Sequence, residues 1–241
     1  EFMTRDLSKH DIIAIFIDGK AFADRDMVIA LGVTLAGDKV LLGFIETDTE
    51  NFQVCRDFLN GLLDRGLSTK HEILFIIDGS KGIHKAITKV MKETAFIQRC
   101  QWHKRENVLA YLPKSHQADF KRKLQAAYEA PSYEAATKRM EVIKKELRLI
   151  NQSALTSLEE GFEETLTLHR LGMFDMLGTS FKTTNCIENV NSRLGTYTDR
   201  VRCWRNSDQR HRWIGTTLLE VEPTLRKVRG HRHLSELRAA M

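Results

Sequence analysis

Short apolar runs, rich in β-branched residues, mark the beginning of the chain. Residues 12–17 are apolar throughout, which is typical of a strand buried on both faces of a sheet, and the run ends at Asp18-Gly19. Residues 27–35 and 39–45 are further apolar runs, and residues 36–38 between them are a typical hairpin sequence. The pattern predicts three consecutive antiparallel strands.

The apolar spacing then changes to that of a helix. In residues 51–65 apolar side chains recur every three or four positions, which predicts an amphipathic helix that ends at Gly66. Residues 72–77 form a fourth apolar run, which also ends at an Asp-Gly pair. Residues 83–91 are predicted to be helical, and residues 95–98 are predicted to form a short fifth strand.

This order of elements predicts an α/β protein. Three antiparallel strands, followed by two strands that each come after a helix, is the order of the ribonuclease H-like fold, a mixed five-stranded sheet flanked by helices. From Pro113 to about residue 177 only helical periodicity remains, which predicts an all-helical insertion. A last amphipathic helix is predicted over residues 185–197.

The chain is accordingly divided into four segments. Its first methionine is the third residue, so residues 1–9 are interpreted as a cloning scar and linker and are left out of the predicted fold. Residues 10–112 are predicted to be the first part of a ribonuclease H-like core, and residues 113–180 the helical insertion. Residues 181–241 are predicted to complete the core and to carry a basic C-terminal region.

The composition is that of an ordinary globular protein. Of the 241 residues, 42% are hydrophobic and 29% are charged, enough for a core without disulfide support. No apolar run approaches the roughly 18 residues of a membrane span, and no signal peptide is visible. The four cysteines are scattered without a C-x-x-C pair, which argues against a secreted disulfide scaffold and for a reducing, intracellular compartment.

The positive charge is concentrated in the last quarter of the chain. Residues 182–241 hold 12 of the 37 Lys and Arg residues and only 6 of the 32 Asp and Glu residues, whereas residues 1–181 are almost balanced. Trp204 and Trp213 are interleaved with these cations, and arginine with aromatic residues suits phosphate and base contacts. A solvated basic face is the alternative. The candidate DNA-binding residues are Arg193, Arg200, Arg202, Arg205, Arg210 and Arg212.

Two aspartates follow apolar strands, each with a glycine after it. Asp18 and Asp78 would lie a few ångströms apart, because the first and fourth strands are neighbours in a fold of this strand order. Two such carboxylates repel each other, and a divalent cation relieves the repulsion. Oxygen ligands favour Mg²⁺, with Mn²⁺ as a substitute. The alternative for each aspartate alone is that it opens a turn.

Glu188 is the candidate for a third carboxylate ligand. In the stretch TTNCIENVN, Thr184 or Asn185 could cap a helix, and Glu188 three residues after Asn185 fits a capping box. Glu188 and Asn191 would share the polar face of that helix. The alternatives are thus a cap and a catalytic carboxylate, and the two roles are compatible.

These motifs together resemble the catalytic core of mutator-type DDE transposases, including their bacterial insertion-sequence relatives. The resemblance rests on FIDGK around Asp18, DGSKGIHKA from Asp78, RCQWHKREN with Cys100 and His103, and TTNCIENVN with Glu188 and Asn191. It covers most of the chain. The order of the four motifs, with a helical stretch before the last, makes it fairly specific.

The resemblance implies a ribonuclease H-like fold and Mg²⁺-dependent DNA cleavage and strand transfer. Asp18, Asp78 and Glu188 would be both the catalytic residues and the metal ligands. The implied partners are DNA, as transposon ends and target, and a second copy of the chain in a dimer. The implied location is the bacterial cytoplasm, in association with the nucleoid. The family's N-terminal DNA-binding region is expected to be missing, because the first core strand starts near residue 11.

Cys100 and His103 have three possible roles. In the first role they form half of a zinc site, for which His231 and His233 are the only other close ligand pair. Alternatively, they are a buried cysteine and a locally bonded histidine. The resemblance favours a third role, in which the pair supports the edge of the active site or positions DNA. Trp102 between them is expected to be packed rather than stacked on a base.

Two other functions remain open at this point. The same fold and carboxylates would suit a metal-dependent nuclease that only hydrolyses DNA. A non-catalytic DNA-binding or assembly module with vestigial carboxylates is the other alternative.

Overall fold

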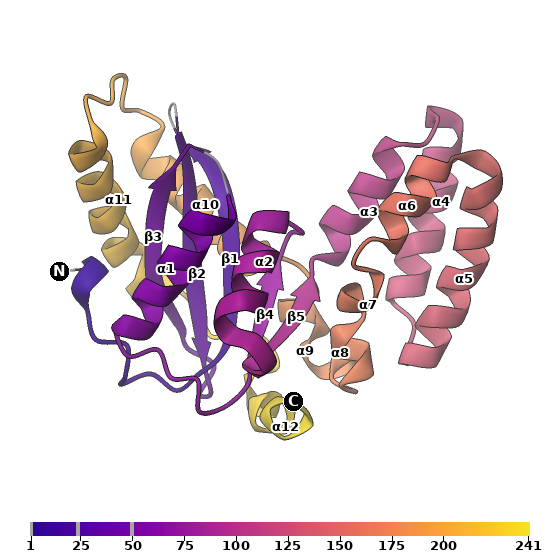
Figure 1. Ribbon diagram of the computed structural model, residues 1–241, viewed down its shortest axis with the longest axis horizontal. Helices are drawn as coiled ribbons and strands as arrows, with labels where there is room; N and C mark the ends of the chain where they lie inside the picture. Colours follow the sequence, from indigo (N-terminus) through magenta and orange to yellow (C-terminus); the bar gives the residue numbers. More distant parts are fainter. Residues whose placement is uncertain (1, 23–24, 49–50) are drawn as a thin grey trace.

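The computed structural model describes residues 2–22, 25–48 and 51–241. A five-stranded mixed sheet has the order β3-β2-β1-β4-β5 (Figure 1). Strands β1 (Ile12–Phe22), β2 (Arg25–Thr34) and β3 (Lys39–Thr47) form antiparallel pairs. Strands β4 (Ile73–Ile77) and β5 (Ala95–Arg99) continue the sheet in parallel. The α/β class and the mixed sheet are confirmed.

The prediction that the first strand ends at Asp18-Gly19 is wrong. Asp18 pairs with Ile29 and Gly19 with Val28, and the antiparallel ladder continues to Phe22. Only the parallel pairing with β4 stops earlier, at Ile17 and Ile77. β1 is longer than its sequence pattern because β2 supplies hydrogen-bond partners beyond the point where β4 ends. Asp18 therefore lies within a strand and does not open a turn.

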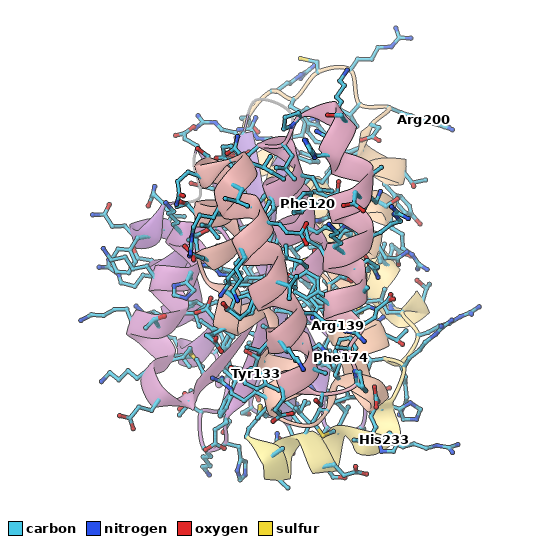
Figure 2. All side chains as sticks on the ribbon, turned by 90° about the vertical axis from the view of Figure 1, so that its right-hand side faces the viewer. Phe120, Tyr133, Arg139, Phe174, Arg200 and His233 are labelled. Atoms are coloured by element: carbon cyan, nitrogen blue, oxygen red, sulfur yellow. The ribbon has the colours of Figure 1, made fainter. Side chains whose placement is uncertain are left out.

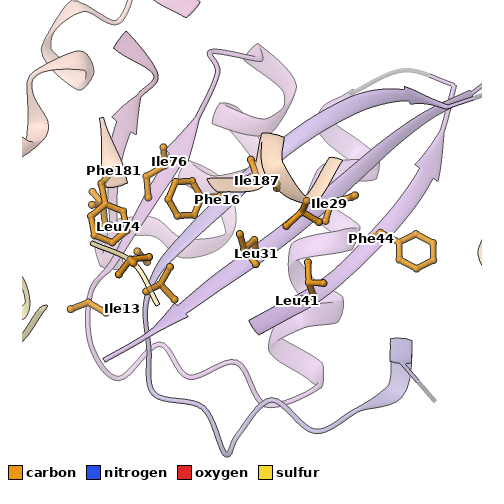
Figure 3. Packing of buried hydrophobic residues seen from close by; sticks show 14 of the residues in the cluster. Ile13, Phe16, Ile29, Leu31, Leu41, Phe44, Leu74, Ile76, Phe181 and Ile187 are labelled. Atoms are coloured by element: carbon orange, nitrogen blue, oxygen red, sulfur yellow. The ribbon is translucent and has the colours of Figure 1, made fainter. Parts of the chain in front are cut away.

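Helices cover both faces of the sheet. One face packs on α1 (Phe52–Asp64) and α2 (Lys81–Met91). The other face packs on α9 (Phe174–Phe181), α10 (Asn185–Thr198), α11 (Ser207–Val221) and α12 (Leu234–Ala240). In Figure 3, Phe16 and Ile76 of the sheet lie close to Phe181 and Ile187 of these helices. Both faces of β1 and β4 are buried, which explains why their sequences lack polar alternation.

Residues 2–9 belong to the packed structure, although they were left out of the predicted fold. Phe2 stacks on Phe44 with 6.1 Å between ring centroids, and Leu7 is fully buried against α1. Arg5 donates to both carboxylate oxygens of Glu222, at 2.9 and 2.7 Å.

The middle of the chain forms a separate group of helices beside β5 (Figure 1). Their buried apolar residues make a cluster of their own that runs from Val108 to Leu166. Residues after Leu166, beginning with Leu168, pack on the sheet instead. The group consists of α3 (Gln101–Ala110), α4 (Lys114–Tyr128), α5 (Tyr133–Ile150), α6 (Gln152–Glu159) and α7 (Phe162–Thr165), and α8 (Thr167–Arg170) leads from it back to the sheet.

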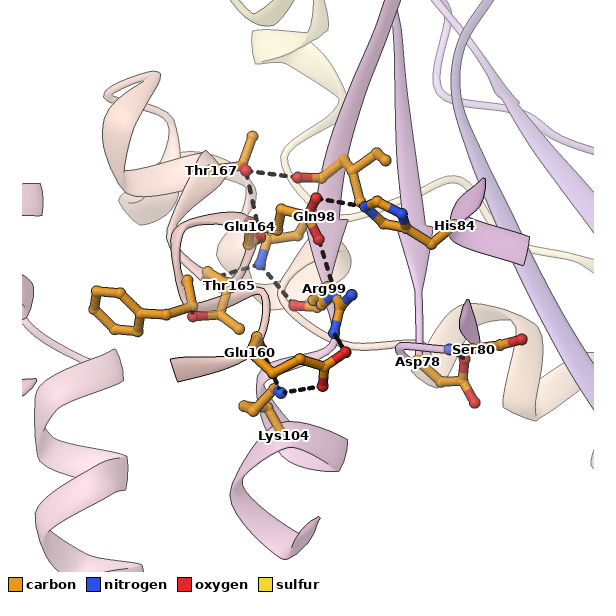
Figure 4. Close-up of polar contacts among 12 residues, drawn as sticks. Asp78, Ser80, His84, Gln98, Arg99, Lys104, Glu160, Glu164, Thr165 and Thr167 are labelled. Atoms are coloured by element: carbon orange, nitrogen blue, oxygen red, sulfur yellow. Dashed lines mark hydrogen bonds and ion pairs between the residues drawn. The ribbon is translucent and has the colours of Figure 1, made fainter. Parts of the chain in front are cut away.

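A polar network joins this helical group to the edge of the sheet (Figure 4). Gln98 donates its side-chain amide to the carbonyl of Thr165 at 2.8 Å. Arg99 Nε donates to Glu164 Oε2 at 2.7 Å, and Glu164 Oε1 lies 2.6 Å from the ring of His84. Because these groups come from β5, α2 and α7, the network fixes the helical group against β5 and α2.

Short 3-10 helices complete the described structure, at Phe2–Thr4, Lys92–Thr94, Glu222–Thr224 and His231–His233. Within the described residues, none of the helices has the length and apolar character needed to cross a membrane.

Gly230 holds the C-terminal segment close to α9. Its φ is +79°, and a Cβ added there would lie 2.2 Å from the carbonyl oxygen of Met176. We expect Gly230→Ala to lower the free energy of unfolding by about 3 kcal/mol, since a left-handed conformation alone costs about 1–2 kcal/mol and the contact with backbone adds to it. Gly172→Ala is the matched control, because Gly172 has φ +68° but no atom within 4 Å. If urea denaturation shows the same loss of unfolding free energy for Gly230→Ala and Gly172→Ala, the contact with Met176 is relieved at no cost.

Candidate active site

The register of the sheet brings the two candidate aspartates together. In the parallel pair, Ile17 is the partner of Ile77, so Asp18 within β1 and Asp78 directly after β4 follow the last paired residues at the same edge of the sheet. This edge is the carboxyl end of the parallel strands, where ligands bind in open α/β sheets. Asp78 also accepts a hydrogen bond from the backbone N–H of Ser80 at 2.9 Å, so it opens a turn at the start of α2.

Asp18 is held by the helix that carries Glu188. Asp18 as a residue is only 8% exposed, and its Oδ2 accepts a 2.9 Å hydrogen bond from Nδ2 of Asn191. Lys20, two residues along β1, donates its ammonium to the backbone carbonyl of Asn191 at 2.9 Å. A buried carboxylate is costly unless it is bound, and these contacts both satisfy Asp18 and fix α10 on β1.

The N-terminus of α10 places Glu188 on the same face as Asn191. The helix begins at Asn185 with Thr184 as its N-cap, but the Thr184 hydroxyl does not accept a backbone N–H, so the predicted capping box does not form. Instead, Oγ1 of Thr184 donates to Oε1 of Glu188 at 2.6 Å. Glu188 and Asn191 are three residues apart and therefore neighbours on the helix surface.

Thr184 also contacts Cys100 and His103. Its Oγ1 lies 3.5 Å from the buried sulfur of Cys100 and 3.3 Å from Nδ1 of His103. Burial alone would raise the pKa of the Cys100 thiol, but hydrogen bonds from His103 and Thr184 outweigh it and lower that pKa. The sequence showed these residues only as separate motifs, and the structure joins them to Glu188 through one hydroxyl.

His103 is the cation of this cluster. Its hydrogen bond with Cys100 raises the pKa of His103 to about 9 against the opposing effect of burial, and the charges of Cys100, Asp78 and Glu188 raise it further. The imidazole is therefore protonated at neutral pH. A positive charge beside two of the three candidate carboxylates partly offsets their mutual repulsion.

We expect NMR of the metal-free protein to show His103 titrating near pH 9. Its folded-state pKa lies above the ordinary 6.5, so its contribution to stability is fully present below pH 6.5 and is lost as pH rises through about 9. Cys100→Ala should move the titration down towards the ordinary value, because the first cause of the shift is removed. A midpoint near 6.5 in the parent protein would contradict the paired geometry.

The three carboxylates do not already form a closed cage. Among the described residues, no group of three or more His, Cys, Asp and Glu side chains is arranged to hold one metal ion. Asp18 and Asp78 directly follow the last register pair of β1 and β4, while the carboxylate of Glu188 is bound by Thr184.

One buried oxygen atom next to Asp18 is free to accept a hydrogen bond from water or to bind a cation. Nδ2 of Asn191 is used by Asp18, but in the described part of the chain its Oδ1 is buried and has no hydrogen-bond partner. Such orphaned acceptors are rare in native proteins and indicate that a water or an ion completes the site. The side chains at this edge offer carboxylate oxygens, the ligands preferred by Mg²⁺ and Mn²⁺. The residues present therefore fit a divalent cation.

The candidate DNA-binding arginines separate into two groups. Arg200, Arg202 and Arg205 are exposed in the segment between α10 and α11, and Arg212 is exposed on α11. Arg200 extends from this segment away from the body of the molecule (Figure 2). Arg193 is half-buried and donates to the hydroxyl of Thr224.

Arg210 does not fit the predicted DNA contact. Its side chain is buried, and its Nε donates to Oε1 of Glu46 on β3 at 2.9 Å. The sequence could not show this pairing, because the two residues are 164 positions apart. Arg210 is therefore used to fasten α11 to the sheet and is removed from the candidate DNA surface.

The neighbours of Cys100 and His103 differ from those expected in two respects. Trp102 was expected to be packed, but it is 47% exposed and meets His103 edge-on with 4.8 Å between ring centroids. His231 and His233, the residues considered for a shared zinc site, have other partners. Nδ1 of His231 lies 3.3 Å from the carbonyl of Val228, and Nδ1 of His233 lies 2.9 Å from Glu236.

Residues 1–226 match the model of the transposase family called Mutator. The chain belongs to this family. The resemblance drawn from the four motifs is thereby confirmed. Relatives include the transposase for insertion sequence element IS256 in transposon Tn4001 of Staphylococcus aureus, which is 27% identical over 80% of this chain and 48% of that protein.

Other relatives are also transposases for insertion sequence elements. That of IST2 from Acidithiobacillus ferrooxidans is 30% identical over 78% of this chain and 62% of its own length. That of IS6120 from Mycolicibacterium smegmatis is 36% identical over 47% of this chain and 36% of its own length. The chain thus spans from about a third to about three fifths of the curated relatives it matches.

Proposed function

We propose that this Mutator-family chain is the catalytic core of a DDE transposase that cleaves DNA and joins the freed end to a target. The observation that carries the proposal is the meeting of three elements at one edge of the sheet. Asp18 and Asp78 follow the last paired residues of β1 and β4, and Asn191 of α10, which shares its helix face with Glu188, donates to Asp18. The strand order β3-β2-β1-β4-β5 supports a ribonuclease H-like core, and residues 113–180 would be its helical insertion.

Asp18, Asp78 and Glu188 would hold Mg²⁺, or Mn²⁺ in its place. When bound between such carboxylates, two divalent ions activate an attacking oxygen and stabilise a leaving oxygen in phosphoryl transfer. Asn191 orients the Asp18 carboxylate through its 2.9 Å hydrogen bond, and Lys20 fixes the backbone of Asn191. Thr184 sets the position of Glu188 and connects it to Cys100 and His103, which would support the active-site edge.

The exposed arginines would contact the DNA backbone. Arg200, Arg202 and Arg205 extend from one segment, and phosphate contacts of this kind bind with little sequence preference and weaken as salt increases. The DNA would comprise transposon ends and target, and a dimer would be the active assembly. A bacterial cytoplasmic location, near the nucleoid, fits this substrate.

A strand-transfer assay tests the function. The chain is incubated with a labelled pre-cut DNA end that carries a free 3′-hydroxyl, a supercoiled plasmid target, and either Mg²⁺, Mn²⁺ or a chelator. We expect labelled, joined plasmid with either metal and none with the chelator. Metal-dependent nicking without joined product would point to a nuclease instead. Binding of DNA without any metal-dependent product would point to a non-catalytic module.

A further inference from the structure

A small pocket lies directly beside the candidate active site. It has a volume of about 220 Å³, below the roughly 300–1,000 Å³ of sites that enclose a drug-sized ligand. It therefore suits one ring system or one phosphate group rather than a large cofactor. Its lining comes from the first turns of α3, the end of α4 and the segment before α10, and includes Trp102, Arg105, Gln125, Tyr128, Lys182 and Thr183.

One buried hydroxyl belongs to the lining of the pocket. Tyr128 is only 3% exposed, and among the described residues its hydroxyl makes no hydrogen bond of normal geometry. Burial raises the pKa of Tyr128 above its usual range and outweighs the nearby Thr165 side chain, which lowers that pKa, so the hydroxyl stays neutral and can donate or accept. A hydroxyl bonded this weakly is available to a ligand or a water.

The rim of the pocket combines an aromatic ring with cations. Trp102 is 47% exposed, and its ring meets the ring of His103 edge-on. Nζ of Lys182 lies 5.6 Å from the centre of the Phe174 ring. The guanidinium of Arg105 donates hydrogen bonds to Glu106 and Gln125. Within the described lining there are two cations and no carboxylate, which favours an anionic occupant with a planar group.

Two lining residues of the pocket are chain neighbours of the candidate active site. Trp102 precedes His103, and Thr183 precedes Thr184, the residue whose hydroxyl contacts both His103 and Glu188. This places the pocket close enough to the site for one substrate to reach both.

We infer that this pocket takes one unstacked nucleotide of the DNA substrate. Its base stacks on Trp102, its phosphate meets Lys182 and Arg105, and the Tyr128 hydroxyl hydrogen-bonds the base or the sugar. The inference rests on the proposed function, since it takes DNA as the substrate. The nucleotide would be extruded from the duplex or lie in a single-stranded end, because a base inside a duplex offers no free face.

Binding measurements test the inference without any cleavage. Fluorescence anisotropy is measured with labelled duplexes that carry a short single-stranded 3′ end, using Asp18→Asn protein so that the DNA stays intact. We expect Trp102→Ala to raise the Kd roughly 5- to 150-fold, the effect of removing one base–aromatic stack. Trp102→Tyr should retain most of the affinity. Tyr111→Ala is the matched control, because Tyr111 is 53% exposed just after α3 but lines a different cavity.

An abasic scan separates stacking from a merely structural role. A single abasic site is moved along the single-stranded end, and at one position it should weaken binding by Asp18→Asn protein. At that position the additional effect of Trp102→Ala should disappear, because both changes remove the same stack. If Trp102→Ala weakens binding by the same factor on intact DNA and on every abasic DNA, the inference is overturned.

The outcomes also separate this inference from the proposed function. Unchanged affinity in Trp102→Ala, with normal strand transfer by the chain that keeps Asp18, overturns the nucleotide pocket alone. Failure of the chain to bind any of the DNAs overturns both.

Discussion

Asp18→Asn is expected to abolish Mg²⁺-dependent cleavage and joining, with a loss of at least roughly 1,000-fold, because catalytic groups that act as a unit fail together. The substitution keeps the size and shape of the side chain, and an asparagine oxygen can still accept the hydrogen bond from Asn191. It removes the negative charge that a divalent cation needs. Gel assays of strand transfer, together with thermal unfolding, would show lost activity in a protein of nearly unchanged stability.

Asp78→Asn and Glu188→Gln are expected to give the same loss, and a double substitution is expected to be no worse than a single one. Asp199→Asn is the matched control, because Asp199 is an exposed carboxylate at the other end of α10. It should cleave like the parent protein. Normal cleavage by Glu188→Gln would show that Glu188 serves only as the partner of Thr184.

Arg99→Met is expected to have a large effect on stability, a loss of roughly 3 kcal/mol in the free energy of unfolding. Arg99 is only 6% exposed at its side chain and bonds Glu164 at 2.7 Å and Glu160 at 3.3 Å. Removing it takes one cation from each carboxylate and leaves Glu164 with His84 at 2.6 Å and Glu160 with Lys104 at 3.3 Å. Because Glu160 and Glu164 retain some solvent contact, the loss stays at the lower end of the roughly 3–5 kcal/mol seen for fully buried pairs.

The control and a rescue make this prediction specific. Arg122→Met removes an arginine of similar pairing, with Asp119 at 3.1 Å, but its side chain is 81% exposed, so a loss of less than about 1 kcal/mol is expected. Adding Glu164→Gln to Arg99→Met should recover part of the stability, because a neutral partner costs less to leave unpaired. Urea denaturation measures all of these variants. Equal losses in Arg99→Met and Arg122→Met would show that the network does not fasten the helical group.

The effect of Arg99 should also depend on pH. Burial would raise the pKa of Glu164, but hydrogen bonds and charges from His84 and Arg99 lower it below the ordinary 4.5. A lowered carboxyl pKa contributes stability above pH 4.5, and that contribution is lost as pH falls through the folded-state value. The stability difference between the parent and Arg99→Met should therefore shrink in acid.

The local elements were largely predictable because they depend on neighbours in the chain. The hairpin before β3, the helix α1 ending before Gly66 and the strand β4 all follow from apolar spacing and turn residues within a few positions. The strand order followed from the sequence of elements, which the sheet confirms. The length of β1 did not, because its second half is stabilised by pairing with β2 after β4 has ended.

In the candidate site, too, the local motifs were predictable and the contacts between them were not. The motifs around Asp18, Asp78, Cys100 and Glu188 could be found in the sequence, because each is a short pattern of chemistry-bearing residues. The links between them could not. Asn191 reaches Asp18 across 173 positions, and Thr184 reaches His103 across 81.

The family, the α/β class and the chemistry-bearing motif residues follow from the sequence alone, because they depend on local spacing and on motif order. How those residues are used depends on the tertiary structure. It joined Thr184 to His103, buried Arg210 against Glu46, and left Trp102 exposed beside a pocket. Each of these outcomes depends on contacts between distant segments, and packing rather than the local pattern determines whether a polar or aromatic side chain is buried, paired or open to solvent.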